Sequence, residues 1–139
     1  MTFEWNGGDY VPRRRMIHHY HGDAVRGLFL VSALVLIVAQ STGAELPFPT
    51  AGAVIAAIAL VVSAGITNPR GFWIHWVDAF LAVIGTFLFG TAAVEHYRAS
   101  RNLFDPSFAY VEALAFLSLF ALYFTTRTIR GFHSRPKLP

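Results

Sequence analysis

The residues best placed to do chemistry in this chain are Asp78 and His75, which lie in the apolar stretch 72–98. The middle of that stretch, residues 79–94, carries no charge. A charged side chain near the centre of a bilayer costs about 2.5–3.5 kcal/mol on insertion scales, so an acid in such a segment indicates a function. We expect Asp78 to face a helix bundle or a partner subunit. It is either a hydrogen-bonded anchor that fixes helix register, or a proton or cation acceptor with His75 as its neighbour.

A second group of ionisable residues, Glu95, His96 and Glu112, is expected at the other side of the membrane. Glu112 follows Pro106 by six residues, so in an antiparallel hairpin it comes to a depth similar to that of Glu95. Two carboxylates at one depth could collect a cation. Glu95 and His96 point about 100° apart on a helix, which argues against both ligating one metal ion. The alternatives are a hydrogen-bonded interface cluster or an ion pair between Glu95 and Arg98.

The histidine-rich segment 18–23 invites a metal interpretation, because His18 and His21 would share a helical face. Spacing identifies no further ligand group, and the neighbouring arginines favour contact with lipid headgroups. A haem needs two imidazoles at matched depth on facing helices, whereas His75 and His96 lie at opposite ends of one segment. A haem-carrying redox subunit therefore remains a remote alternative. We predict no metal ion and no cofactor.

The composition is that of a membrane protein rather than a soluble enzyme. Hydrophobic residues make up 55% of the chain and charged residues only 14%, against roughly 25% charged in soluble domains. The chain has no cysteine, which excludes disulfides, thiolate metal sites and a cysteine nucleophile. Because no phosphate loop, zinc-protease helix or nucleophile elbow occurs, we expect no enzymatic activity.

Four apolar segments must position the ionisable residues. The stretch 72–98 would be roughly 40 Å long as a helix, enough to cross a hydrocarbon layer about 30 Å thick. Turn and capping signals at Pro47, Pro49 and Asp105-Pro106 separate the segments. We predict an all-α membrane protein, an up-down-up-down bundle of four transmembrane helices within residues 27–131, at about 27–44, 50–66, 72–98 and 106–130. The first segment also resembles a cleavable signal peptide, but its leading region is long for one.

The basic residues set the expected orientation. With four spans, nine of the eleven fall on one side, and positively charged segments resist translocation. Both ends, the tail 1–26 and the tail 132–139, are therefore expected in the cytoplasm, and the membrane is expected to be a prokaryotic inner membrane. Basic clusters in a membrane protein contact anionic lipid rather than nucleic acid. The arginines expected at headgroups are Arg13, Arg14, Arg15, Arg26, Arg127 and Arg130.

Small residues follow one side of the second and the third segment at helical spacing, which allows close helix approach in lipid. We expect these two helices to pack tightly against each other, although simple alanine richness is the alternative. The residues concerned are Gly52, Ala56, Ala59 and Ser63 on the second helix, and Ala82, Thr86 and Gly90 on the third.

The leading expectation for function is a structural or interaction subunit that packs against itself or a larger membrane complex through its small-residue faces. The alternative is an oligomeric proton or cation channel or transport component. Asp78 and the Glu95/Glu112 pair would bind the proton or cation along its path, and several subunits would be needed to enclose that path.

Overall fold

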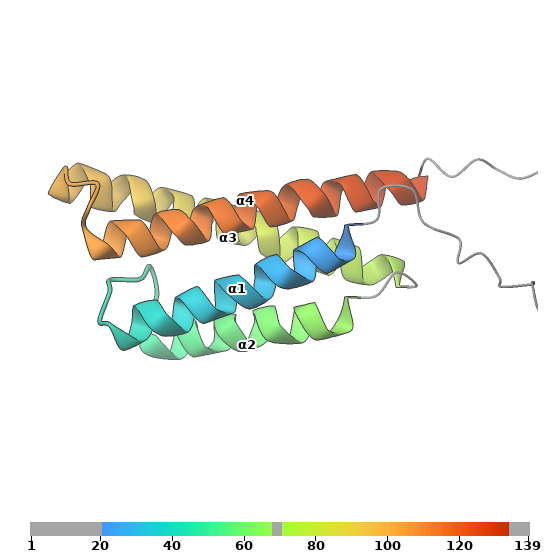
Figure 1. Ribbon diagram of the computed structural model, residues 1–139, viewed down its shortest axis with the longest axis horizontal. Coiled ribbons are helices and arrows are strands. Elements are labelled where there is room, and N and C mark those ends of the chain that lie inside the picture. Colours follow the sequence, from blue (N-terminus) through green and yellow to red (C-terminus); the bar gives the residue numbers. More distant parts are fainter. Residues whose placement is uncertain (1–20, 68–70, 134–139) are drawn as a thin grey trace, which may run out of the picture.

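The computed structural model describes residues 21–67 and 71–133 of the chain. Within them the fold is all-helical with four helices, as predicted: α1 (Gly22–Ser41), α2 (Thr50–Ile66), α3 (Phe72–Ser100) and α4 (Pro106–His133) (Figure 1). The expected headgroup contacts of Arg13, Arg14 and Arg15, and the metal alternative at His18 and His19, concern residues outside this part.

Local signals set most helix boundaries. Pro49 is extended (φ −67°, ψ 169°) and precedes α2, and α4 begins at Pro106, where a missing N–H leaves no helical hydrogen bond unmade. The start of α1 differs, because the helix begins at Gly22 rather than at the predicted Gly27. A long-range contact stabilises this earlier start, in which the backbone N–H of His21 donates to Thr128 Oγ1 on α4 (3.0 Å).

Three helices, α1, α3 and α4, are long and apolar enough to cross a membrane. The fourth, α2, is apolar but has only 17 residues, which gives roughly 25 Å of helix. Large apolar side chains point outward on the bundle, among them Leu34, Ile55 and Phe87, with exposed fractions of 61%, 68% and 71%. Such a surface suits a hydrocarbon environment rather than water.

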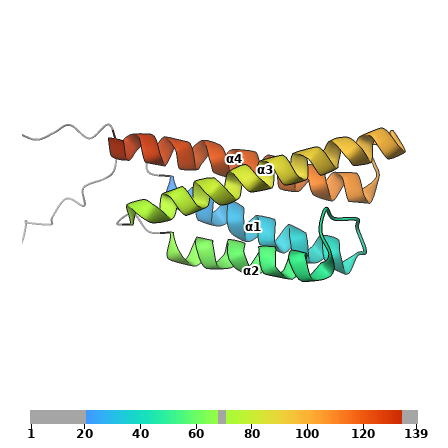
Figure 2. The same cartoon turned by 180° about the vertical axis from the view of Figure 1, so that it is seen from behind.

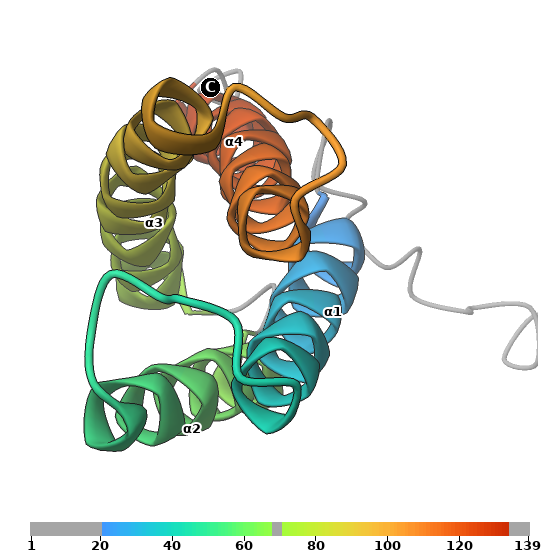
Figure 3. The same ribbon diagram turned by 90° about the vertical axis from the view of Figure 1, so that its left-hand side faces the viewer.

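The helices pack in the order α3, α4, α1, α2 around the bundle (Figure 3). The most extensive contact is between α3 and α4, and α1 packs against both α2 and α4. The predicted tight packing of the second and third helices is wrong, because α2 and α3 contact each other least of these four pairs.

Close approach occurs between α3 and α4 because Gly85 faces α4. A methyl group added at Gly85 would lie 2.5 Å from Ser118 Oγ, whereas one added at Gly90 would meet nothing within 4 Å. The glycine that permits the tightest packing is thus not one of those predicted for it. Small residues occur on several faces of α3, and their spacing does not show which face meets which neighbour.

Different segments of the chain meet at the two ends of the bundle (Figure 2). At one end, here called the Glu45 end, the connection 42–49 meets the start of α4, where the backbone N–H of Glu45 donates to Ser107 Oγ (3.1 Å). The other end, here called the His21 end, holds the start of α1, the end of α2, the start of α3 and the end of α4.

Candidate functional site

Asp78 is a fully buried acid at the His21 end. The sequence predicted that Asp78 faces the bundle or a partner subunit, and the structure places it inside the bundle with 0% of its surface exposed. The hydroxyl group of Thr67, the residue after α2, donates to Asp78 Oδ2 at 2.8 Å. Asp78 Oδ1 has no hydrogen-bond partner among the described residues. The end of α2 is thereby tied to the second turn of α3 through a half-satisfied carboxyl group.

Because α3 packs against α4, two buried threonines of α4 lie at the same heights in the bundle as Asp78 and His75 of α3. Gly85 and Ser118 face each other across the α3–α4 contact, and seven residues make nearly two helical turns. Counting seven residues from each therefore leads to Asp78 on α3 and Thr125 on α4, on the faces that meet. Both side chains are buried, and Thr125 Oγ1 also lacks a hydrogen-bond partner in the described part.

One turn further toward the His21 end, the same pairing places His75 level with Thr128. Both are 1% exposed. The Thr128 hydroxyl donates to the carbonyl of Phe124 (3.0 Å) and accepts from the backbone of His21, whose ring lies 5.3 Å from that of Phe124. These contacts add α1 to the site. We call the five residues Thr67, His75, Asp78, Thr125 and Thr128 the buried polar cluster.

No positive charge neutralises Asp78 in residues 21–67 and 71–133, where the ion pairs within 4 Å join Arg26 to Asp23 and His96 to Glu45. The described residues also contain no group of three or more His, Cys, Asp or Glu side chains that could hold a metal ion. The chemistry left to the cluster is that of one carboxyl group hydrogen-bonded to the Thr67 hydroxyl, with further buried hydroxyl groups and an imidazole in the neighbouring turns of α3 and α4.

No protein-family model, curated protein or solved structure matches this chain. Its function therefore has to be argued from the cluster and from the surfaces of the bundle. In lipid, a buried carboxyl group is stable when it is neutral or when each oxygen is paired. Asp78 offers one paired and one unpaired oxygen.

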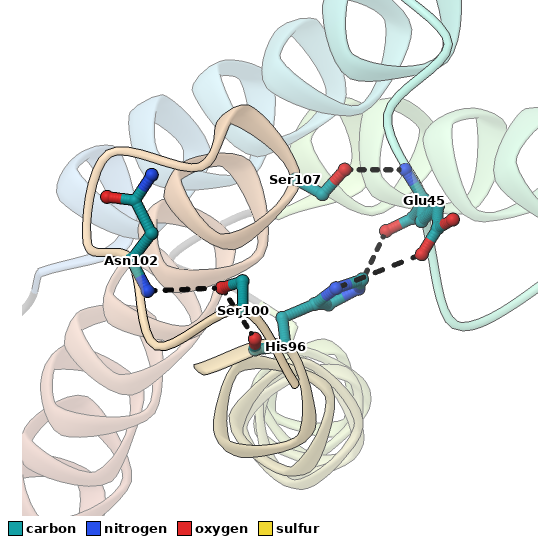
Figure 4. Close-up of polar contacts among 5 residues, drawn as sticks. All are labelled: Glu45, His96, Ser100, Asn102 and Ser107. Atoms are coloured by element: carbon teal, nitrogen blue, oxygen red, sulfur yellow. Dashed lines mark hydrogen bonds and ion pairs between the residues drawn. The ribbon is translucent and has the colours of Figure 1, made fainter. Parts of the chain in front are cut away.

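A second polar contact, which the sequence did not suggest, joins the α1–α2 connection to α3 and α4 at the Glu45 end (Figure 4). His96 Nε2 lies 3.2 Å from the carbonyl oxygen of Glu45, and His96 Nδ1 lies 4.0 Å from its carboxylate. Ser107 Oγ is the hydrogen-bond partner of the Glu45 backbone N–H. The predicted site residue His96 thus holds the α1–α2 connection against α3 rather than joining Glu95.

Glu95 and Glu112 do not line a common hollow. Glu95 lines a hollow on the outer face of α3, and Glu112 lines another between α3 and α4. Arg98 borders both hollows. Within the described residues Glu95 and Arg98 form no ion pair, although they are one turn apart. Both side chains are exposed, and no ion pair opposes their charges within residues 21–67 and 71–133.

The predicted packing residues have several different surroundings. Ala56, Ala59 and Ala82 line a partly enclosed apolar cavity of about 100 Å³ to which all four helices contribute residues. Gly52 lies against Phe48 instead. Ser63 is buried, and its carbonyl accepts from Thr67, while Thr86 and Gly90 line the outer hollow of α3.

The threonines of the cluster were missed by sequence reasoning, although α4 carries a signal. Ser118, Thr125 and Thr128 follow one another by seven and three residues, which puts them on one face of an apolar helix. A polar stripe of this kind on a membrane helix indicates a buried contact with a neighbouring helix. Thr67 had no such signal, because it lies in the turn after α2.

Proposed function

We propose that the chain is a four-span integral membrane protein of up-down-up-down topology, with both ends in the cytoplasm of a prokaryotic cell. Its role is that of a structural or interaction subunit. Three helices are sufficient in length and hydropathy, and α2, at 17 residues, meets the lower limit for a span. The outward residues of α2 support its contact with lipid, since Val54, Ile55, Ile58 and Val62 are all at least half exposed.

The orientation is supported by the basic residues of the bundle. Arg26, Arg127 and Arg130 belong to the His21 end, and by sequence nine of the eleven basic residues fall on that side of a four-span arrangement. The positive-inside tendency then directs the His21 end to the cytoplasm. Arg26 and Arg130 are exposed, as residues that contact anionic headgroups need to be.

The partner we propose is a second copy of the chain, bound along the outer face of α3. This face carries a hollow of about 410 Å³ whose lining includes Thr86, Gly90 and Thr91. The hydroxyl groups of the two threonines donate to backbone carbonyls of their own helix at 2.7 and 2.8 Å, so the face presents small, internally satisfied groups between the apolar side chains of Phe87 and Val94. Such a face permits close helix approach in lipid.

The single observation that carries the proposal is the pair of unopposed charges, Glu95 and Arg98, at the end of this hollow. They lie about 4.5 Å apart along the helix axis. In a two-fold dimer whose axis is normal to the membrane, each contact occurs twice in reciprocal form. Glu95 of each copy then pairs with the partner subunit's Arg98, and both charges are matched.

Cysteine crosslinking tests the dimer, because the chain has no cysteine of its own. Val94→Cys lies on the proposed face, and Leu34→Cys on α1 is a matched control that is also exposed. In native membranes we expect a disulfide-linked dimer from V94C and little from L34C. The proposal fails if the two variants crosslink to the same extent.

Charge reversal adds a more specific test in the V94C background. E95R and R98E should each reduce the crosslinked fraction several-fold, because each places like charges opposite one another. The double variant E95R/R98E should restore crosslinking, since the reciprocal pairs are rebuilt with opposite sign. Single reversals that leave crosslinking unchanged would contradict the proposed interface.

The oligomeric proton or cation pathway remains a second candidate, favoured by the complete burial of Asp78. Between the cluster and the Glu45 end the interior of one copy is apolar, with Leu36, Phe89 and Leu114 in its core. Such a pathway would therefore need several subunits. Loss of ion flux in proteoliposomes on Asp78→Asn would support it, and unchanged flux would contradict it.

A further inference from the structure

The buried polar cluster carries an inference that is independent of the dimer. Asp78 is enclosed on all sides by the bundle, with Thr67 after α2, His75 on its own helix, and Thr125 at its level on α4. A carboxylate in such a place is costly unless a cation or several donors balance it. The described contacts of Asp78 provide one hydroxyl group.

The hydrogen bonds of that hydroxyl group bear on the protonation state. Thr67 Oγ1 lies 2.7 Å from the carbonyl oxygen of Ser63 and 2.8 Å from Asp78 Oδ2. A hydroxyl group has one proton to donate, but its oxygen can also accept. The Ser63 carbonyl can only accept, so a charged Asp78 would have to share the Thr67 proton with it.

A protonated Asp78 satisfies both contacts in full. Its O–H donates to Thr67 Oγ1, and the Thr67 proton goes to the Ser63 carbonyl. The same heavy-atom positions fit both the charged and the neutral acid, because hydroxyl hydrogens are placed from the hydrogen-bond network. The neutral acid makes two complete hydrogen bonds where the anion makes two partial ones.

Among the described residues, the groups that face Asp78 from the surrounding elements include no counter-charge. The described part of α2 has no titratable residue. On α1, Arg26 is exposed and lies 3.9 Å from Asp23. On α4, Arg127 donates to the Tyr123 hydroxyl and lies over its ring, and Arg130 is exposed. In the described part of the chain, the titratable groups that share this end of the bundle with Asp78 include the imidazoles of His75 and His21.

Polar atoms with unused hydrogen-bonding capacity mark a route from Asp78 toward the His21 end. Asp78 Oδ1, Thr125 Oγ1 and His21 Nε2 are buried and lack partners in the described part of the chain. Asp78 is on α3, Thr125 is on α4, and His21 directly precedes α1. The backbone N–H of His21 donates to Thr128, which is on α4 one turn beyond Thr125. Hydroxyl and imidazole groups both accept and donate protons.

We propose that Asp78 binds an exchangeable proton as a neutral carboxylic acid, with Thr67 as its hydrogen-bond acceptor and with Thr125 and His21 on its route to the His21 end. The ligand is a proton rather than a metal ion, because a single carboxyl group with hydroxyls is a poor set of metal ligands and no larger group of ligating side chains is present in residues 21–67 and 71–133.

Infrared spectroscopy of the full chain in proteoliposomes tests the proposal. At neutral pH, the wild type should show a protonated-carboxyl C=O band that is absent in Asp78→Asn. The triple variant D9N/D23N/D105N, which replaces the other aspartates, should keep it. In heavy water the band should shift, because the proton exchanges. Thr67→Val should move the band toward the frequency of a free acid, and Thr67→Ser should not.

Each alternative outcome is decisive. Absence of the band from the wild type means that Asp78 is charged, and a band that survives D78N belongs to another residue. A band that does not shift in heavy water means that the proton does not exchange. Loss of the band on addition of sodium ions means that the site binds a cation instead. Isotopic labelling of aspartate identifies the band without substitution if D78N fails to fold. None of these readouts depends on crosslinking at α3.

Discussion

One hydroxyl group, that of Thr67, connects α2 to the acid of α3. The residue Thr67 is 3% exposed, and its hydroxyl oxygen lies at hydrogen-bond distance from Ser63 and Asp78. The sequence predicted that Asp78 would face the bundle or a partner subunit, because it lies in an apolar segment, and the structure shows that it faces the bundle. It did not predict Thr67 as the partner, because a residue in a turn shows no periodicity that would assign it to a contact.

Substitution of Thr67 should show how much this contact stabilises the bundle. Thr67→Val removes the hydroxyl group but keeps the shape, and we expect a loss of about 1–3 kcal/mol, the usual result of leaving buried polar groups unpaired. Thr67→Ser keeps the hydroxyl group and should retain most of the stability. Reversible unfolding in detergent measures both, and a Thr67→Val variant as stable as the wild type would show that the hydroxyl group does not stabilise the bundle.

For the helices, the sequence predicted where most of them begin but not which helices pack against each other. Thr50 and Pro106 begin helices where the sequence predicted them, because caps and prolines act within a few residues. The start of α1 depends on Thr128, which is 107 residues away. The contact of α3 with α4 depends on which small residues face a complementary surface on another helix. The alanines of α2 had the same helical spacing, so the sequence wrongly indicated that α2 packs against α3.

Gly85 provides the test at this scale. Gly85→Ala should destabilise the protein by about 1–3 kcal/mol, because the new methyl group would lie 2.5 Å from Ser118 Oγ. Gly27→Ala is the matched control in a helix, since nothing lies within 4 Å of its added methyl group, and it should be neutral or stabilising by up to about 1 kcal/mol. Thermal unfolding in detergent compares them. A G85A variant as stable as G27A would contradict the close α3–α4 contact.

For the whole molecule, the contact of the α1–α2 connection with the start of α4 at the Glu45 end supports four spans. Glu45 is hydrogen-bonded to Ser107, so residues 42–49 and 101–105 belong to the same end of the bundle. If α1 and α3 both cross the bilayer toward that end, α2 has to return between them. The short α2 would then cross as well, with its outward apolar side chains in lipid.

Cysteine accessibility is the most direct measurement of this arrangement, because any introduced cysteine is unique in the chain. Thr42→Cys and Asn102→Cys lie at the Glu45 end, and Asp23→Cys lies at the His21 end; all three positions are exposed. With a membrane-impermeant maleimide applied to intact spheroplasts, we expect T42C and N102C to be labelled at once, and D23C only after the membrane is permeabilised. Labelling of D23C from outside, or labelling of T42C and N102C from opposite sides, would contradict the four-span arrangement with both ends in the cytoplasm.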